Sequence, residues 1–196
     1  SERLIGAFVR LLESGARTLE SYLSSRLTAH ELHFKKTAYN WLAFSHDHPP
    51  CFDEHGRHIP QTKFGTVYFQ DRTDRDLAFL VLNGKIQFAY WVAIGDDFDV
   101  TKWMFADLPI DLRRLGVEER AALLPFVVEL RERMNNAIQF KLNAGKRVGN
   151  YNLAKCRSVT DETDAIIAKA YGLDRVLSDI DLLYVQIVKT DFEESA

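Results

Sequence analysis

The stretch from Gly145 to Arg157, GKRVGNYNLAKCR, gathers residue types that contact nucleic acids. Lysine and arginine neutralise phosphates, and asparagine can form two hydrogen bonds to the edge of an adenine. The residues of this kind are Lys146, Arg147, Asn150, Asn152, Lys155 and Arg157. The same composition also suits a basic loop that forms ion pairs with an acidic remainder, so the stretch alone leaves both interpretations open.

Histidines form a second candidate site, because four of them lie close to Cys51: His46, His48, His55 and His58. Structural zinc sites usually separate paired ligands by more than the single residue between His46 and His48. We therefore expect a polar loop with solvated imidazoles and no metal. A small metal-dependent enzyme built on this loop is the least favoured of the functions considered.

Other catalytic patterns are missing from the sequence. There is no G-x-S-x-G elbow, and neither Cys51 nor Cys156 carries an activating signature. The glycines around Lys146 lack the Walker spacing of a phosphate loop. The carboxylates of Asp96, Asp97 and Asp99 lack the spacing of a calcium loop, so we expect a solvated turn there. We predict no catalytic residue, no metal and no cofactor in this chain.

The longest apolar stretch, residues 76–111, must lie in the core and position the rest, because each buried apolar side chain contributes about 1.5–3 kcal/mol. Its Asn83-Gly84 pair is typical of a β-hairpin. Its apolar residues also form a helical stripe that includes Leu77, Leu80 and Val81. Periodicity therefore leaves helix and hairpin equally open for residues 76–94.

The flanking elements follow from periodicity and from turn residues. Residues 3–27 predict an amphipathic helix that Gly15 weakens, and residues 51–52 and 57–59 predict a hairpin before a strand at 64–70. Asp74 is the expected N-cap of the next element. We expect a helix at 118–143, in which Pro125 makes a kink or marks the first turn, followed by a basic loop at 144–159. A further helix should begin at Thr160 or Asp161 and end before Gly172, and Ser178 should cap a last helix.

These elements predict an α+β fold, with a small antiparallel sheet, a long N-terminal helix and a helical C-terminal part. The apolar central helices of this fold are implied only by the family resemblance described below. We divide the chain into a domain at residues 1–116 and a helical part at 117–196. At 196 residues, with 46% hydrophobic and 27% charged residues, the chain has the composition of an ordinary globular protein.

Hydropathy, cysteine content and charge indicate where the protein is located and what it attracts. No apolar stretch reaches the roughly 20 residues of a membrane span, and two cysteines give no disulfide framework, so we expect a cytoplasmic protein. The net charge is −3, yet residues 133–160 contain no Asp or Glu and carry six cations. Such a local field attracts anions despite the total. The chain begins without Met, so we expect a piece of a longer protein.

Several short motifs resemble the DNA specificity regions of type IIG restriction–modification enzymes and related adenine-N6 methyltransferases, with a related form in type I specificity subunits. They are LVLNGKI at residues 80–86, Tyr90, and Trp103 followed by DLPI at 107–110. PCFDEHG at 50–56 and TVYF at 66–69 are similar to the family's hairpin and strand, and GNYNL at 149–153 with Cys156-Arg157 resembles segments near the ends of some members. The resemblance covers residues 46–190 and favours two helices with a kink at 76–94.

The chain also departs from that family. Gly84 stands where the family prefers Ser, and Asp111 stands where a second Pro is common. The Asn/Asp-Pro-Pro-aromatic motif of the methyltransferases is missing, since the only Pro-Pro lies in HPPC at 48–51, and no Phe-x-Gly-x-Gly loop is present. The resemblance therefore implies that S-adenosylmethionine would bind a catalytic domain elsewhere in the parent chain.

The resemblance implies a target-recognition domain whose partners are double-stranded DNA and the catalytic methyltransferase domain of the same chain. Lys146, Arg147, Lys155 and Arg157 would contact phosphates, and Asn150 and Asn152 would read bases. Lys102 and Trp103 are second candidates for DNA contact. The alternative is a helical protein-interaction module whose helices at 3–27 and 118–143 pair with a partner subunit.

Overall fold

A four-stranded antiparallel sheet in the order β1-β5-β2-β3 underlies the N-terminal half of the chain. The computed structural model describes residues 2–37, 42–95 and 99–188. The predicted strand at 64–70 is confirmed as β5, whose residues 64–68 pair with all of β2. The strands are β1 (Leu23–Ser24), β2 (Glu31–Lys35), β3 (Phe44–Ser45) and β5 (Phe64–Phe69).

The central apolar stretch forms two consecutive helices, as the family resemblance implied, and not the hairpin that Asn83-Gly84 suggested. Helices α2 (Arg72–Asn83) and α3 (Lys85–Ile94) meet at a bend of 67°. Every residue from Asp76 to Trp91 is buried. The N-cap of α2 is Asp71 and not Asp74, because the Asp71 carboxylate accepts the hydrogen bond from the Asp74 N–H.

Two side chains fix the bend. The Asn83 amide donates to the Phe44 and Phe79 carbonyls and accepts from the Phe44 N–H, so α2 is held to β3. The Asp164 carboxylate accepts from the Lys85 N–H at 2.8 Å and caps the start of α3. A Cβ atom at Gly84 would lie 2.2 Å from Asp164 Oδ1, so only glycine fits between the two helices.

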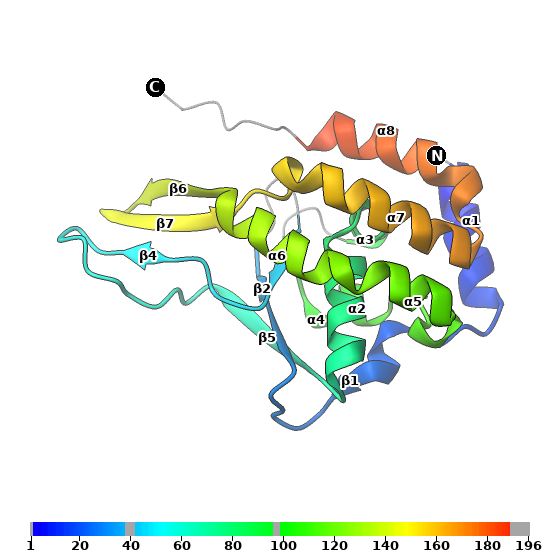
Figure 1. Ribbon diagram of the computed structural model, residues 1–196. Helices are drawn as coiled ribbons and strands as arrows, with labels where there is room; N and C mark the ends of the chain where they lie inside the picture. Colours follow the sequence, from blue (N-terminus) through cyan, green and yellow to red (C-terminus); the bar gives the residue numbers. More distant parts are fainter. Residues whose placement is uncertain (1, 38–41, 96–98, 189–196) are drawn as a thin grey trace.

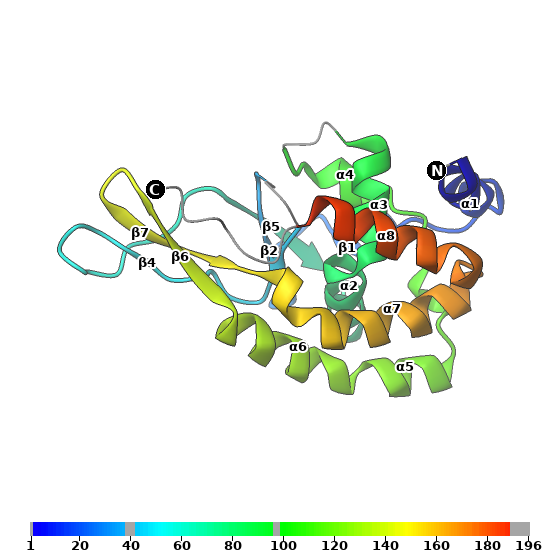
Figure 2. The same ribbon diagram turned by 90° about the horizontal axis from the view of Figure 1, so that it is seen from above.

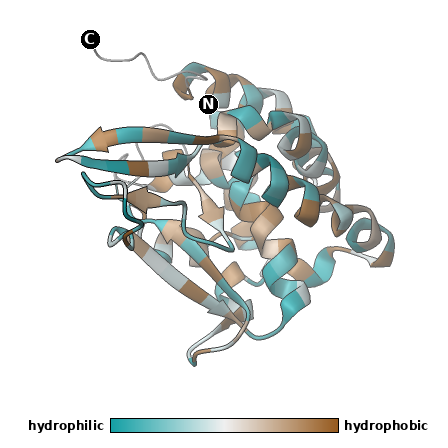
Figure 3. Ribbon diagram, turned by 60° about the vertical axis from the view of Figure 1, so that its left-hand side comes forward, coloured by the Kyte–Doolittle hydropathy of each residue, from teal (hydrophilic) through white to brown (hydrophobic). Residues whose placement is uncertain are grey.

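The outer helices cover α2 and α3 on one side (Figures 1 and 2). Hydrophobic colours gather on the helices at the centre, whereas the outer helices carry both colours (Figure 3). The outer helices are α5 (Val117–Leu123), α6 (Pro125–Asn136), α7 (Arg157–Tyr171) and α8 (Leu177–Ile187). Helix α4 (Lys102–Ala106) contacts α3 and lies on the side of α2 and α3 that faces away from α5, α6 and α7 (Figure 2).

Two predicted helices are shorter than expected. The N-terminal helix α1 (Glu2–Glu13) ends well before residue 27, because Gly15 adopts a left-handed φ of +67° and the chain continues into a 3-10 turn, Leu19–Tyr22, and β1. The predicted helix at 118–143 divides at Pro125, which lies in the first turn of α6, and ends at Asn136. Residues beyond Ala137 form a strand instead.

The predicted basic loop at 144–159 is wrong. Strand β6 (Ile138–Asn143) turns through Ala144 and Gly145 into β7 (Lys146–Tyr151), and both turn residues have positive φ, as a two-residue hairpin requires. A 3-10 turn, Leu153–Cys156, leads into α7, which begins before Thr160 and ends, as predicted, before left-handed Gly172. Helix α8 has Val176 and not Ser178 at its N-cap.

A second, three-stranded sheet has the order β4-β7-β6, where β4 is Cys51–Phe52. The predicted hairpin is confirmed, since the Ile59 N–H donates to the Cys51 carbonyl and Phe52 pairs with His58. The two sheets and the helices confirm the predicted α+β class. Residues from both sides of position 116 share one hydrophobic core, and β4 and β7 join the two predicted parts in one sheet.

Among the described residues, no single helix is long and apolar enough to cross a membrane. The α2–α3 pair meets that criterion only when its two bent members are counted together.

Candidate nucleic-acid interface

The β6–β7 hairpin extends beyond the ends of the outer helices, with the β4 segment beside it (Figure 1). Lys141 pairs with Val148 and Asn143 pairs with Lys146, so these four side chains lie on one face of the hairpin. Phe140 and Arg147 alternate with them and lie on the other face. We call these the inner and the outer face.

The outer face carries an arginine supported by two aromatic rings. The Arg147 guanidinium lies 4.9 Å from the centre of the Phe140 ring and 5.9 Å from that of Phe52. The two rings are 5.9 Å apart, which joins β4 to β6 across β7. Arg147 is itself exposed, so its planar donor group is held in position while it can still reach an anion.

The inner face forms one wall of a pocket of about 460 Å³. The opposite wall is the segment from Ile59 to Phe64, with Lys35 and Thr37 beside it. Gln61 fixes the two walls together, because its amide donates to the Pro49 and Gly149 carbonyls at 2.9 Å each. Gly149 allows this close approach, since a Cβ atom there would lie 2.5 Å from the Pro50 carbonyl oxygen.

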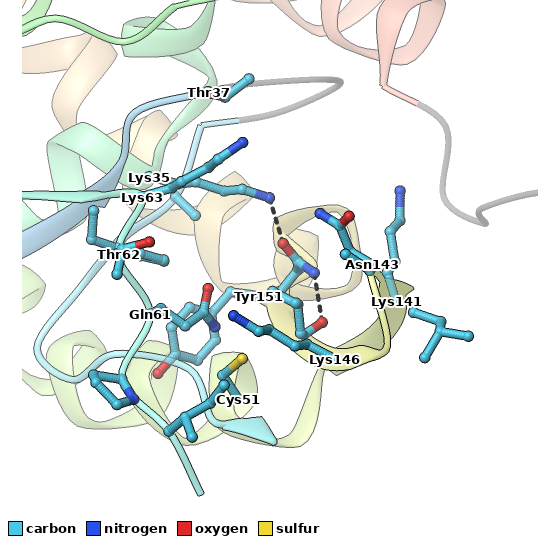
Figure 4. Close-up of a pocket in the computed structure, with 18 residues that line it drawn as sticks. Lys35, Thr37, Cys51, Gln61, Thr62, Lys63, Lys141, Asn143, Lys146 and Tyr151 are labelled. Carbon is cyan, nitrogen blue, oxygen red and sulfur yellow. Dashed lines mark hydrogen bonds between the residues drawn. The ribbon is translucent and has the colours of Figure 1, made fainter. Parts of the chain in front are cut away.

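Four lysines line this pocket, and no Asp or Glu occurs among the described residues that line it. Lys35 and Lys63 lie on one side, and Lys141 and Lys146 lie on the hairpin side (Figure 4). Burial lowers the pKa of Lys35 to about 8, with a further contribution from the charges of Lys141 and Lys63. Burial also lowers the pKa of Lys141. The site therefore gathers four lysines with no acidic residue among its described lining.

Two of the predicted base-reading residues have internal roles. Asn150 is buried, and its carbonyl oxygen accepts a hydrogen bond from Lys35 while its amide donates to the Val148 carbonyl. Asn152 has no exposed surface; its side chain accepts from the Ala154 N–H and donates to Gln139. The structure therefore makes Asn150 a positioning residue for Lys35 and removes Asn152 from the proposed interface.

Arg157 is also used internally. Its guanidinium donates to Asp181 at 2.8 Å and to Asp161 at 3.4 Å, which joins α7 to α8. Lys85 binds the same two carboxylates at 2.8 Å. Arg157 is therefore balanced by acids and is a poor candidate for a phosphate contact.

The remaining candidates are exposed but do not form one cluster. Lys146 and Arg147 lie on the two faces of the hairpin, and Lys155 lies in the 3-10 turn that follows it. Lys102 and Trp103 are in α4, which is apart from the hairpin in both views (Figures 1 and 2). The hairpin and its turn, and not α4, therefore form the candidate interface.

The histidine-rich segment does not gather into a metal site among the described residues. The prediction of solvated imidazoles is wrong for His46, whose side chain is only 9% exposed and lies 3.5 Å from the Asp76 carboxylate. His48 stacks on Phe64, and His58 lies against Phe52. Of the predicted acidic turn, Asp96 and Asp97 lie outside the described residues.

Sequence reasoning missed Lys35 and Lys63 as site residues, although a charge signal was present. Residues 32–46 and 55–70 also contain no Asp or Glu. The fold brings these two acid-free stretches against the third, residues 133–160, and nearly all of the pocket lining comes from the three. A search of the sequence for stretches without Asp or Glu would thus have found the three segments that line the pocket.

Comparisons with family models, with curated proteins and with solved structures found no match to this chain.

Proposed function

We propose that this chain is a DNA target-recognition domain of a restriction–modification adenine-N6 methyltransferase and that it binds duplex DNA through the β6–β7 hairpin. The observation that carries the proposal is the projection of this basic, acid-free hairpin from an otherwise acidic chain. The major groove of B-DNA is about 12 Å wide and admits a two-stranded β-ribbon. A protruding hairpin with cations on both faces has the form and the charge for that groove.

The proposed contacts follow from exposure and charge. Lys146, Arg147 and Lys155 would neutralise phosphates, and Asn143 at the end of β6 is exposed and replaces the buried asparagines as the candidate for base contact. Binding would place the target adenine for a catalytic domain of the same parent protein, which would flip the base out and supply S-adenosylmethionine.

Fluorescence anisotropy with a labelled duplex of mixed sequence tests this proposal. Titrations at several NaCl concentrations give the slope of log K against log [salt], and three phosphate contacts predict a slope of roughly −3. A chain that does not bind duplex DNA at low salt would sink the proposal. Binding that is insensitive to salt would also contradict it, since phosphate contacts must release counterions.

A protein-interaction module remains the second candidate, because α1 exposes an apolar stripe. Ile5, Val9 and Leu12 are 54%, 41% and 46% exposed and recur at helical spacing, while the opposite side of α1 packs on the core. Light scattering tests this function. A mass above that of the monomer that returns to monomer in the Ile5→Glu/Leu12→Glu variant would favour it, and a monomer at all concentrations would exclude self-association through α1.

A further inference from the structure

The lysine-lined pocket on the inner face of the hairpin has the size of a small-molecule site. Its volume of about 460 Å³ lies within the range of roughly 300–1,000 Å³ that is typical of ligand pockets. A pocket of this volume holds one drug-sized ligand and cannot admit a DNA duplex. The occupant must therefore be a single small molecule or the end of a strand.

The pocket is built before any ligand arrives. Gln61 bridges the two walls through its bonds to the Pro49 and Gly149 carbonyls, and the Gly149 N–H donates to the Pro50 carbonyl at 2.8 Å. Asn150 holds the Lys35 ammonium toward the cavity. Because these contacts are already made, a ligand need not order the walls when it binds.

The charge of the pocket selects an oligoanion. Four lysines from both walls line one cavity, and no carboxylate occurs among its described lining residues. Focusing of the field within a cleft strengthens its attraction for anions. One carboxylate would offset only part of this charge, whereas a chain of phosphates presents several charges to lysines on opposite sides.

The remaining lining is apolar and suits an organic group attached to the phosphates. Ile59, Pro60 and Phe64 belong to one wall, and Val148 and Tyr151 belong to the other. Asn143 and Thr62 add exposed polar groups beside them. A purely inorganic anion would leave this apolar surface unused, but a nucleoside would bury part of it.

We propose that this pocket binds a nucleoside oligophosphate, with the phosphates between Lys35, Lys63, Lys141 and Lys146 and the nucleoside against the apolar wall. The site lies on the inner face of the hairpin and shares Lys146 and Asn143 with the proposed duplex interface, but its ligand binding does not depend on duplex binding. The same chemistry is offered by a free nucleotide and by the 5′-phosphorylated end of a strand.

Isothermal titration calorimetry of the full chain at low ionic strength tests the proposal, with ATP in the absence of divalent metal as the probe. Adenosine and inorganic triphosphate are the matched ligands. We expect ATP to bind at least tenfold more tightly than inorganic triphosphate and at least a hundredfold more tightly than adenosine. Failure of ATP to bind, or equal binding of inorganic triphosphate, would overturn the nucleotide assignment.

The Lys63→Gln/Lys141→Gln variant tests the location, because both lysines are exposed and their replacement leaves the core intact. We expect ATP binding to weaken at least tenfold with an unchanged melting temperature. The Lys36→Gln variant is the control, because Lys36 adjoins Lys35 in sequence, is exposed and does not line the pocket. ATP binding that survives in the double variant would place the nucleotide elsewhere and refute the proposal.

A pair of oligothymidylates that differ only in the 5′-phosphate identifies the source of the ligand. Tighter binding of the phosphorylated strand, lost in the double variant, assigns the pocket to strand ends, and equal binding of the two strands assigns it to free nucleotides. Duplex binding is measured separately on the same variants. ATP binding without duplex binding would refute the proposed function alone, and the reverse would refute the pocket proposal alone.

Discussion

The side-chain amine of Lys35 donates a hydrogen bond to the amide oxygen of Asn150, a residue 115 positions later in the chain. The bond joins β2 of the first sheet to β7 of the second, next to the lysine-lined pocket. Asn150 cannot carry a negative charge, so it orients the ammonium group without neutralising it. The bond thereby fixes a half-buried lysine at the wall of the pocket.

This arrangement predicts that anion binding depends on pH. The pKa of Lys35 is lowered to about 8, mainly by burial, so the amine loses its charge as the pH rises through 8. An anion favours the charged form, and binding at pH 8–9 should therefore weaken with rising pH and take up protons. Calorimetry with inorganic triphosphate in two buffers of different ionisation enthalpy measures this uptake. An equal uptake in the Lys35→Gln variant would assign the effect to another group.

The hairpin cations should set the salt dependence of duplex binding. We expect the Lys146→Ala/Arg147→Ala variant to bind all duplex sequences more weakly. The slope of log K against log [salt] should become flatter by about 1–2 units, because the variant makes fewer phosphate contacts and its binding therefore releases fewer counterions. Lys169→Ala is the control, since Lys169 is exposed on α7. An unchanged slope in the double variant would remove both residues from the interface.

The bend between α2 and α3 should not tolerate a side chain at residue 84. A methyl group there would lie 2.2 Å from Asp164 Oδ1, so Gly84→Ala should lower the free energy of unfolding by about 1–3 kcal/mol, the usual cost of overpacking. Gly6→Ala in α1 is the matched control. Its nearest neighbour would be an Arg10 side-chain atom at 3.5 Å, and a gain of about 0.4–1 kcal/mol is expected there. Urea denaturation of both variants distinguishes a local clash from a general effect of removing glycine.

Asp164 should make stability depend on pH. Burial raises its pKa to about 7, against the lowering effect of the Lys85 N–H and ammonium groups. The unfolded chain releases this proton near pH 3.8, so between the two values the folded protein holds a proton that the unfolded chain has lost. The contribution of Asp164 to the free energy of unfolding should therefore be complete below pH 3.8 and disappear as the pH rises through 7.

The Asp164→Asn variant isolates this contribution. Urea midpoints between pH 4 and pH 8 should fall less steeply in the variant than in the wild type. Asp174→Asn serves as the control because Asp174 is exposed. If the wild type and the Asp164→Asn variant showed the same pH dependence, Asp164 would not hold the proton.

Part of the fold was predictable from local residue types, since strand β5 and the hairpin at β4 agree with expectation. The two helices at residues 76–94 agree with the family resemblance, whereas periodicity left helix and hairpin equally open. The main error arose where two periodicities coincide. Ile138 and Leu142 continue the helical spacing of α6, but they also alternate with Gln139 and Lys141 as a strand requires. The segment forms a strand because the chain turns back at Ala144-Gly145, where Ala144 has a left-handed conformation. The sequence did not predict this turn, because Ala-Gly is a weaker hairpin signal than Asn-Gly.

The candidate site was less predictable than the fold. Lys146 and Arg147 were found because they lie in one acid-free stretch. Lys35 and Lys63 were not, because they reach the pocket only through the pairing of β2 with β5 and through the bond from Lys35 to Asn150. Asn152 and Arg157 show the opposite error, since a favourable residue type on a basic segment does not reveal that its polar atoms are already used.

The pairing of β4 with β7 has a consequence for how such a chain can change over generations. Cys51 and Phe52 lie against Val148 and Arg147, so the support of the hairpin is encoded far upstream of the hairpin itself. A recombination breakpoint near residue 116 would combine the β6–β7 hairpin of one parental sequence with the β4 strand of another. Exchange of the β6–β7 hairpin between homologous proteins should therefore preserve the fold only when β4 is exchanged with it.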